Sequence, residues 1–333
     1  MKIGRFPTGR RNSITDVPGV KVGHYTVDTP EHQTGVTVIL PCEDDIFRRK
    51  MVAACHVLNG FGKTTGLVQI EELGTLETPI ALTNTLNVGL VHDAVVEYMC
   101  QQAEAHDDAI TSVNPIICEC NDWFLNDIRH RAIGTDEVFA AIRSADVAFA
   151  EGAVGAGRGM SCHGLKGGIG TSSREITIGE QTFTVGVLVL TNHGSLGDLT
   201  VDGNRIGQEI DLKIQADAPD RGSCIMIVAT DLPVSDRQLK RIIKRCSVGL
   251  ARVGSYIGHG SGEIMVGFST ANRIPDNDAF CQMTYIHESR INTAFRAVAE
   301  ATEEAVLRSM LKAEPVTGYH HHRRRSLAEF FDG

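Results

Sequence analysis

The sequence has neither a long apolar run nor an excess of basic residues. No window reaches about 18 consecutive apolar residues, the length that a membrane span requires. The net charge is −9, so the chain has no diffuse positive field that would attract nucleic acid. Residues 1–25 also lack the apolar core of a signal peptide. We therefore expect a cytoplasmic protein with neither a membrane nor a nucleic acid as its partner.

Motifs for metals, cofactors and disulfides are missing as well. The nine cysteines are an odd number without CxxC spacing, which suits a reducing compartment. Cys118 and Cys120 are too close together for a zinc knuckle, so we interpret them as small strand residues. The chain has no HExxH, no Walker loop and no GxGxxG after a strand. We expect no metal and no cofactor.

The main basic run is "HHHRRR" at 320–325. Short basic runs near a terminus are usually disordered or make weak contacts. The sequence therefore predicts a solvated C-terminal tail.

The residues that are present predict a large α/β core. A chain of 333 residues with 42% hydrophobic content can bury one large domain or two closely packed ones. Strand-length apolar runs recur, bounded by turn residues, at 35–40, 78–85, 113–120, 183–192, 224–230 and 263–270. Helical patterns lie between and after them at 87–103, 135–152, 235–250 and 293–312. Strands covered by helices indicate a layered α/β or α+β domain.

Local signals refine the helix and loop assignments. Thr135 is the expected N-cap of the second helix, and Ser235 begins a capping box at the start of the third. Glycine-rich stretches at 152–160 and 164–173 lack the Walker order of residues. We expect tight turns beside a site there, because glycine permits positive φ and close backbone approach. A cradle for an anion is the less favoured alternative.

One short stretch suggests a catalytic device. Gly222 and Ser223 stand directly before the apolar run of residues 224–230. An N-terminal serine can use its own freed α-amine as the base, because the amine pKa of roughly 7.7–8.0 lies near physiological pH. Such a serine should begin a strand and follow a small residue, and Ser223 meets both conditions. The plain alternative is a turn that leads into a strand.

Two other positions compete with Ser223 for this role. Gly254–Ser255 and Gly170–Thr171 are also glycine–hydroxyl pairs, but neither precedes a continuous apolar run. The requirement for a strand therefore favours Ser223.

Three further stretches supply polar partners. Ser261 and Glu263 are two apart at a probable strand start, so they should share a face and support a nucleophile. Glu119 and Asn121 should share a face in the same way, offering a carboxylate for a free amine and an amide for an oxyanion. Asn192 ends an apolar strand and offers another amide. Each of these residues is otherwise an ordinary turn or capping residue.

Ten ordered stretches together resemble the family of L-aminopeptidase/D-esterases and β-peptidyl aminopeptidases, which are self-processing N-terminal serine hydrolases related in fold to ornithine acetyltransferase. The similarity covers nearly the whole chain. The stretches are "ITDVPGVKVGH" (14–24), "HVLNGFGKTTGL" (56–67), "PIALTNTLNVG" (79–89), "CECNDWFLNDI" (118–128), "VGAGRGMSCHGLKGGIGTSSR" (154–174), "LTNHG" (190–194), "GSCIMIVATDLPVSDRQLKRIIKR" (222–245), "GLARVGS" (249–255), "GSGEIMVGFSTAN" (260–272) and "EATEEAV" (300–306).

The resemblance implies a fold and a set of roles. The fold would be a four-layered αββα sandwich, Ntn-hydrolase-like, with residues 1–333 as a single catalytic domain. Autocleavage between Gly222 and Ser223 would give chains 1–222 and 223–333, assembled as a homotetramer. The resemblance implies that Ser223 is the nucleophile and that Ser261 and Glu263 support it. It implies that Asn192 stabilises the oxyanion and that Glu119 binds the substrate amine. Asn121 falls on a position near the site that varies within the family.

The implied function is an aminopeptidase, amidase or esterase that acts on small peptides, amides or esters through an acyl-enzyme. Two alternatives remain: an acetyltransferase of related fold, and an unprocessed binding protein on the same scaffold. Lys63, Arg158 and His163 stand where relatives often have other residues. Lys63 and Arg158 lead to the hypothesis of an acidic or carboxylate-bearing substrate.

Overall fold

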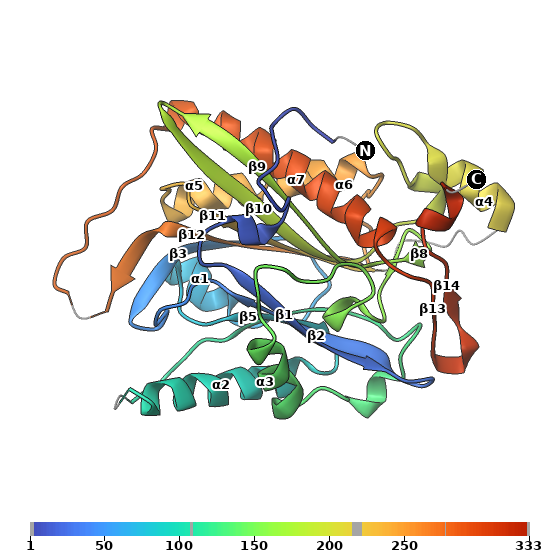
Figure 1. The fold of residues 1–333 in the computed structure, drawn as a ribbon, viewed down its shortest axis with the longest axis horizontal. Coiled ribbons are helices and arrows are strands. Elements are labelled where there is room, and N and C mark those ends of the chain that lie inside the picture. Colours follow the sequence, from blue (N-terminus) through green and yellow to red (C-terminus); the bar gives the residue numbers. More distant parts are fainter. Residues whose placement is uncertain (1–2, 107–108, 215–221, 277, 332–333) are drawn as a thin grey trace.

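The computed structural model describes residues 3–106, 109–214, 222–276 and 278–331. Within these residues, two β-sheets lie face to face between two layers of helices (Figure 1). Helices α2 and α3 pack on the smaller sheet, and α5 and α7 pack on the larger one, with α6 packed against α7. The four-layered αββα sandwich predicted from the sequence is confirmed.

Each sheet combines strands that are distant in the sequence. In spatial order, the smaller sheet consists of β1 (Lys21–Asp28), β2 (Gln33–Leu40), β5 (Ile80–Asn84) and β6 (Ile116–Cys120). In the same order, the larger sheet consists of β4 (Thr75–Leu76), β3 (Arg49–Gly60), β12 (Gly262–Pro275), β11 (Ser223–Thr230), β10 (Gln181–Asn192) and β9 (Gly168–Ile178). Two small hairpins pair β7 (Ser161–Cys162) with β8 (Leu165–Lys166), and β13 (Val316–Thr317) with β14 (Arg323–Arg324).

The helices of the described residues are α1 (Leu67–Leu73), α2 (Val88–Glu104), α3 (Thr135–Arg143), α4 (Ile206–Ile214), α5 (Asp236–Ile243), α6 (Cys246–Arg252) and α7 (Asn292–Leu311). None of the helices in this part of the chain is both long and apolar enough to cross a membrane. Ser235 caps α5 with the predicted capping box.

Two helix predictions were too long. The pattern at 135–152 forms a helix only to Arg143, because the chain then bridges to β1 through Asp146 and Val22. Gly134 rather than Thr135 is the N-cap, and its backbone N–H donates to the Glu137 carboxylate. The pattern at 235–250 is divided between α5 and α6.

The glycine-rich stretch at 164–173 was predicted as turns, but most of it belongs to β9. A Cβ on Gly170 would lie 2.0 Å from the carbonyl oxygen of Ala305, so glycine allows α7 to pack closely on the strand. The buried Lys166 ammonium donates to the carbonyls of Gly157, Met160 and Gly167, each at 2.8 Å. The two glycine-rich stretches therefore direct carbonyl oxygens at a cationic side chain, whereas an anion-binding loop would direct backbone N–H groups at its ligand.

Side-chain alternation on β11 assigns its two faces to different cores. Ile225, Ile227 and Ala229 belong to the core that includes the smaller sheet. Cys224, Met226 and Val228 belong to the core under α5, α6 and α7. Because successive side chains on a strand point to opposite faces, Ser223 shares the side that faces the smaller sheet.

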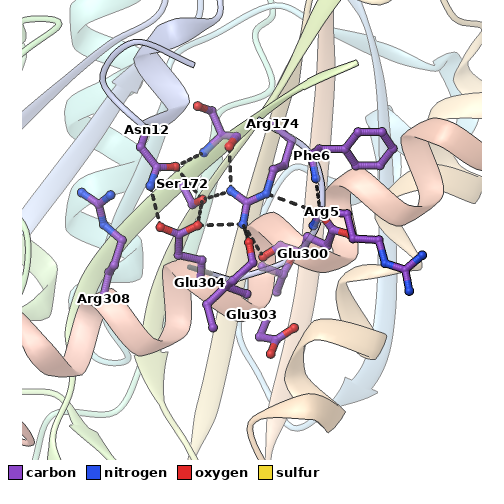
Figure 2. Close-up of polar contacts among 12 residues, drawn as sticks. Arg5, Phe6, Asn12, Ser172, Arg174, Glu300, Glu303, Glu304 and Arg308 are labelled. Carbon is purple, nitrogen blue, oxygen red and sulfur yellow. Dashed lines mark hydrogen bonds and ion pairs between the residues drawn. The ribbon is translucent and has the colours of Figure 1, made fainter. Parts of the chain in front are cut away.

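An ionic network fixes α7 to β9 and to the N-terminal segment (Figure 2). The fully buried Arg174 guanidinium donates to the Glu304 carboxylate at 2.7 Å and lies 3.6 Å from the carboxylate of Glu300. Glu300 in turn accepts the backbone N–H groups of Arg5 and Phe6, at 2.9 and 3.1 Å. Each buried charge is thereby paired, which a buried ion requires.

The C-terminal segment is folded, and the predicted solvated tail is wrong. β13 pairs with β14, and in Figure 1 this hairpin runs along the end of the two sheets. The backbone of Lys166 donates to the carbonyl of Arg325 at 2.8 Å, and Tyr319 donates to the carbonyl of Leu125 at 2.9 Å. The basic run is thus held against the loops that follow the central strands.

Candidate functional site

Ser223 begins β11 between two strands that supply its neighbours. In the antiparallel pairing with β10, Ser223 lies opposite Asn192, and in the parallel pairing with β12 it lies opposite Gly262. The Gly262 backbone N–H donates to the Ser223 Oγ, with a nitrogen–oxygen distance of 3.2 Å. The hydroxyl is therefore positioned by rigid strands and already faces one backbone donor.

Two glycines lie next to the Ser223 hydroxyl, at positions where the surrounding backbone leaves no room for a side chain. A Cβ on Gly222 would lie 1.5 Å from the Asn192 carbonyl oxygen. A Cβ on Gly262 would lie 2.6 Å from the Phe61 carbonyl oxygen and 3.2 Å from the Ser223 Oγ. The small residue that the sequence argument required before Ser223 is thus demanded by the backbone around it. The residues directly before Gly222, 215–221, lie outside the described part of the chain.

Ser261 and Glu263 form the predicted pair beside Gly262. Both side chains are fully buried, and the Ser261 hydroxyl donates to the Glu263 carboxylate. Asn59 on β3 donates to the Ser261 backbone carbonyl, which fixes the start of β12. Because Gly262 lies between the two residues and contacts Ser223, this pair is anchored next to the hydroxyl.

Glu119 on β6 is buried, with 3% of its surface exposed. One carboxylate oxygen accepts the Lys63 backbone N–H at 3.0 Å, and the other accepts the Thr85 hydroxyl. Each oxygen keeps a second lone pair, so the carboxylate can still accept from an ammonium group.

Asn192 is held by both ends of its amide. Its Oδ1 accepts the Ser161 backbone N–H at 2.8 Å, and its Nδ2 donates to the Asn121 backbone carbonyl at 2.9 Å. An amide nitrogen carries two hydrogens, so a second donor remains for a ligand. The exposed Asn121 side chain accepts from the Trp123 backbone N–H, which makes it a turn residue beside the site.

A cavity of about 440 Å³ joins these residues. Five residues of the predicted site line it: Ser223, Gly222, Asn192, Glu119 and Asn121. Ser261 and Glu263 are buried and do not line the cavity. The rival positions Ser255 and Thr171 are absent from the lining, and Thr171 instead lies within β9.

The three residues that depart from the family pattern lie in different surroundings. Lys63 lines the cavity, with its ammonium 4.8 Å from the centre of the Phe61 ring. Arg158 is paired with Asp28 and Glu314, at 2.8 and 2.6 Å, and does not line the cavity. Arg158 therefore lends no support to the hypothesis of a carboxylate-bearing substrate, which rests on Lys63 alone. The buried His163 ring contacts the Ser195 carbonyl through Nδ1.

Sequence reasoning missed several lining residues. The Thr85 hydroxyl donates to the Glu119 carboxylate. The Ser161 hydroxyl accepts from Arg324, and the Phe124 ring lies against the Arg324 guanidinium. Thr85 and Phe124 stand in stretches that carried the family resemblance, and that position was the available signal. Arg324 lies in the basic run that we interpreted as a solvated tail, because its place in the cavity depends on how the C-terminal segment folds back.

One group of side chains near the cavity has donor atoms of the type that metals prefer. Cys162, His163 and His193 each place a ligand atom within 4.8 Å of the others, and all three are buried. They could supply three of the four ligands of a zinc ion. Burial, with a smaller contribution from His163, lowers the pKa of His193 to about 3, so this imidazole is neutral at pH 7.

Comparisons with known proteins agree with this geometry. Residues 12–324 match the sequence profile of peptidase family S58. The chain is 38% identical to "Beta-peptidyl aminopeptidase BapA" of Sphingosinicella xenopeptidilytica, over 93% of this chain and 83% of that protein.

Two solved structures have the same fold. The PH0078 protein from Pyrococcus horikoshii OT3 superimposes with a TM-score of 0.94 at 45% identity, covering 99% of this chain and 95% of that one. The L-aminopeptidase D-Ala-esterase/amidase from Ochrobactrum anthropi gives 0.90 at 33% identity, covering 97% and 93%, and is described as a variant of the Ntn hydrolase fold. The chain therefore belongs to peptidase family S58 and is a hydrolase of the fold that uses an N-terminal nucleophile.

Proposed function

We propose that the protein is a self-processing serine aminopeptidase that releases N-terminal residues from short peptides, amides or esters. The observation that carries the proposal is the cavity itself. It contains a serine at the start of a central strand, a glycine before it that tolerates no side chain, and a buried carboxylate that can hold an amine.

The first reaction is cleavage of the precursor. Ser223 Oγ attacks the Gly222 carbonyl carbon, the Gly222–Ser223 C–N bond breaks, and the Ser223 nitrogen becomes a free amine. The acyl group now forms an ester with Oγ, and water hydrolyses this ester. The products are chains 1–222 and 223–333, which remain packed together because β10, β11 and β12 are neighbours in one sheet.

The mature site uses the new amine as its base. The amine accepts the Ser223 hydroxyl proton while Oγ attacks the substrate carbonyl, and the Ser261–Glu263 pair supports the resulting ammonium. The Asn192 amide and the Gly262 N–H would stabilise the oxyanion, a contribution worth about 2.7–4 kcal/mol for one donor. Water then attacks the acyl-enzyme and releases the acid product.

Glu119 determines which end of a substrate enters. Its carboxylate would bind the ammonium group of the residue being removed, so cleavage is confined to the N-terminal bond. The names of the relatives extend the candidates to peptides that begin with a β-amino acid and to L-aminoacyl and D-alanyl derivatives.

The test is a Ser223→Ala variant, with Ser255→Ala as the matched control. Ser223→Ala should give one uncut band on a denaturing gel and no hydrolysis of aminoacyl p-nitroanilides. Ser255→Ala should give two bands and normal hydrolysis, because Ser255 lies outside the cavity lining. Full processing of Ser223→Ala would show that another residue does the cutting.

Two alternatives are tested by the same material. An acyltransferase would transfer the acyl group to an added amine in preference to water. The ratio of the aminolysed product to the hydrolysed product is therefore measured in the presence of an added amine. An unprocessed binding protein would retain its full mass of 36.0 kDa.

We also propose that the chain forms one catalytic domain, assembles as a homotetramer and works in the cytoplasm. All nine cysteines are free thiols, which suits a reducing compartment. Light scattering of the purified protein measures the assembly.

A further inference from the structure

Arg324 brings a fixed cation into the cavity that contains Ser223 and Glu119. It lies on β14 in the C-terminal hairpin. Its guanidinium carbon is 3.8 Å from the centre of the Phe124 ring, and its Nε donates to the Ser161 hydroxyl at 3.0 Å. The stacking and the hydrogen bond fix the plane of the guanidinium and leave its two terminal nitrogens for another partner.

No carboxylate within the described residues forms an ion pair with Arg324. Two other arginines differ: Arg158 is held by two carboxylates, and the adjacent Arg325 pairs with Glu329 at 2.8 Å. Burial lowers the pKa of the Arg324 guanidinium, and among the residues that the structure describes no acidic group offsets this effect. A partly desolvated cation without a counter-ion favours a ligand that supplies the negative charge.

The position of Arg324 relates it to the reacting atoms. Ser161 accepts from Arg324 through its hydroxyl and donates from its backbone N–H to the Asn192 amide. The guanidinium is therefore one residue away from the proposed oxyanion donor. Glu119 lines the same cavity, so a small zwitterion could place its ammonium on Glu119 and its carboxylate on Arg324.

We propose that Arg324 forms a carboxylate-binding subsite, so that the preferred substrates carry a carboxylate as well as a free amine. The planar guanidinium fork matches a carboxylate with two parallel hydrogen bonds. The inference rests on the proposed aminopeptidase function and deepens it. The carboxylate belongs either to the leaving group, as in a dipeptide, or to an acidic side chain on the residue being removed.

The experiment compares two substrate pairs. Alanyl-alanine and alanyl-alanine amide differ only in the carboxylate of the leaving group. Aspartyl and asparaginyl p-nitroanilide differ only in a carboxylate on the acyl side. The variants are Arg324→Gln, Arg324→Lys and, as a matched control on the same segment, Arg325→Gln, whose side chain binds Glu329 instead.

The expected result is selective. Arg324→Gln should lower kcat/KM about ten- to 100-fold for the carboxylate member of one pair, as for loss of a charged hydrogen-bonded pair. The neutral member should change less than about twofold, Arg324→Lys should recover part of the loss, and Arg325→Gln should behave as wild type. The pair that responds identifies the source of the carboxylate.

Two results would overturn the proposal. Arg324→Gln could lower both members of each pair equally, which would indicate a structural role for Arg324. It could also leave all four substrates unchanged. Gel bands and melting temperatures of the variants are recorded with the kinetics. A variant that loses activity equally on all substrates because it misfolds is then recognised by a lower melting temperature or incomplete processing.

A separate binding measurement keeps this inference distinct from the proposed function. Calorimetry on Ser223→Ala measures the affinity for each pair without turnover, using amides in place of the p-nitroanilides. If the wild type hydrolyses nothing, tighter binding of a carboxylate member that disappears with Arg324→Gln would still support the subsite. Equal affinity for both members of each pair would refute it.

Discussion

Replacement of Glu119 by glutamine tests how the site selects an amino terminus. Glu119 is 3% exposed, and its carboxylate is held by the Lys63 N–H and the Thr85 hydroxyl. Glutamine has the same shape and can keep both contacts, accepting from Lys63 and donating to Thr85. The substitution therefore removes a negative charge from a buried position while the fold is retained.

The size of the effect follows from that burial. Loss of one partner from a buried, hydrogen-bonded charge pair costs about 2–5 kcal/mol. At 1.36 kcal/mol for each factor of ten, this corresponds to a decrease of about 30- to 5,000-fold in kcat/KM for a substrate with a free amine.

The assay compares an aminoacyl p-nitroanilide with its N-acetylated form. Wild type should strongly prefer the free amine, and Glu119→Gln should lose most of that preference. Glu97→Gln is the matched control, because Glu97 is exposed on α2 and contacts Gln101. A Glu119→Gln enzyme within about threefold of wild type on the free amine would refute the assignment.

Three further predictions concern processing and stability. Gly222→Ala should accumulate uncut precursor, because its Cβ would lie 1.5 Å from the Asn192 carbonyl oxygen; two normal bands on a gel would contradict this. Arg174→Met should lower the free energy of unfolding by about 3–5 kcal/mol, since it leaves buried carboxylates unpaired; a loss below about 1 kcal/mol in urea titrations would contradict it. Burial raises the pKa of Asp122 from 3.8 to about 6, so its contribution to stability is full below pH 3.8 and is lost as the pH rises through 6. The unfolding free energy of wild type relative to Asp122→Asn should therefore fall by roughly 2.4 kcal/mol between pH 4 and 7, and parallel curves would refute the assignment.

The sequence contained enough local information to predict the central strands and the serine that begins one of them. A continuous apolar run marks a strand buried on both faces, and β11 is buried along its whole length. The two-residue spacing of Ser261 and Glu263 predicted that they share a face, and the hydrogen bond between their side chains is consistent with that placement. These features depend on neighbours in the chain, which is why a single sequence reveals them.

Features that depend on distant segments were missed or misjudged. Gly170 on β9 is a glycine because α7 crosses the strand closely at this point, and nothing in the local pattern indicates that contact. The basic run near the C-terminus resembles a solvated tail until the hairpin of β13 and β14 packs on the loops near Phe124 and Ser161. The position of Arg324 in the cavity follows from that packing.

Mass spectrometry with N-terminal sequencing of fully active enzyme tests the central claim most directly. The account predicts two polypeptides, the second beginning Ser223-Cys224-Ile225. Active material that consists of a single 36.0 kDa chain with Met1 as its sole amino terminus would contradict it.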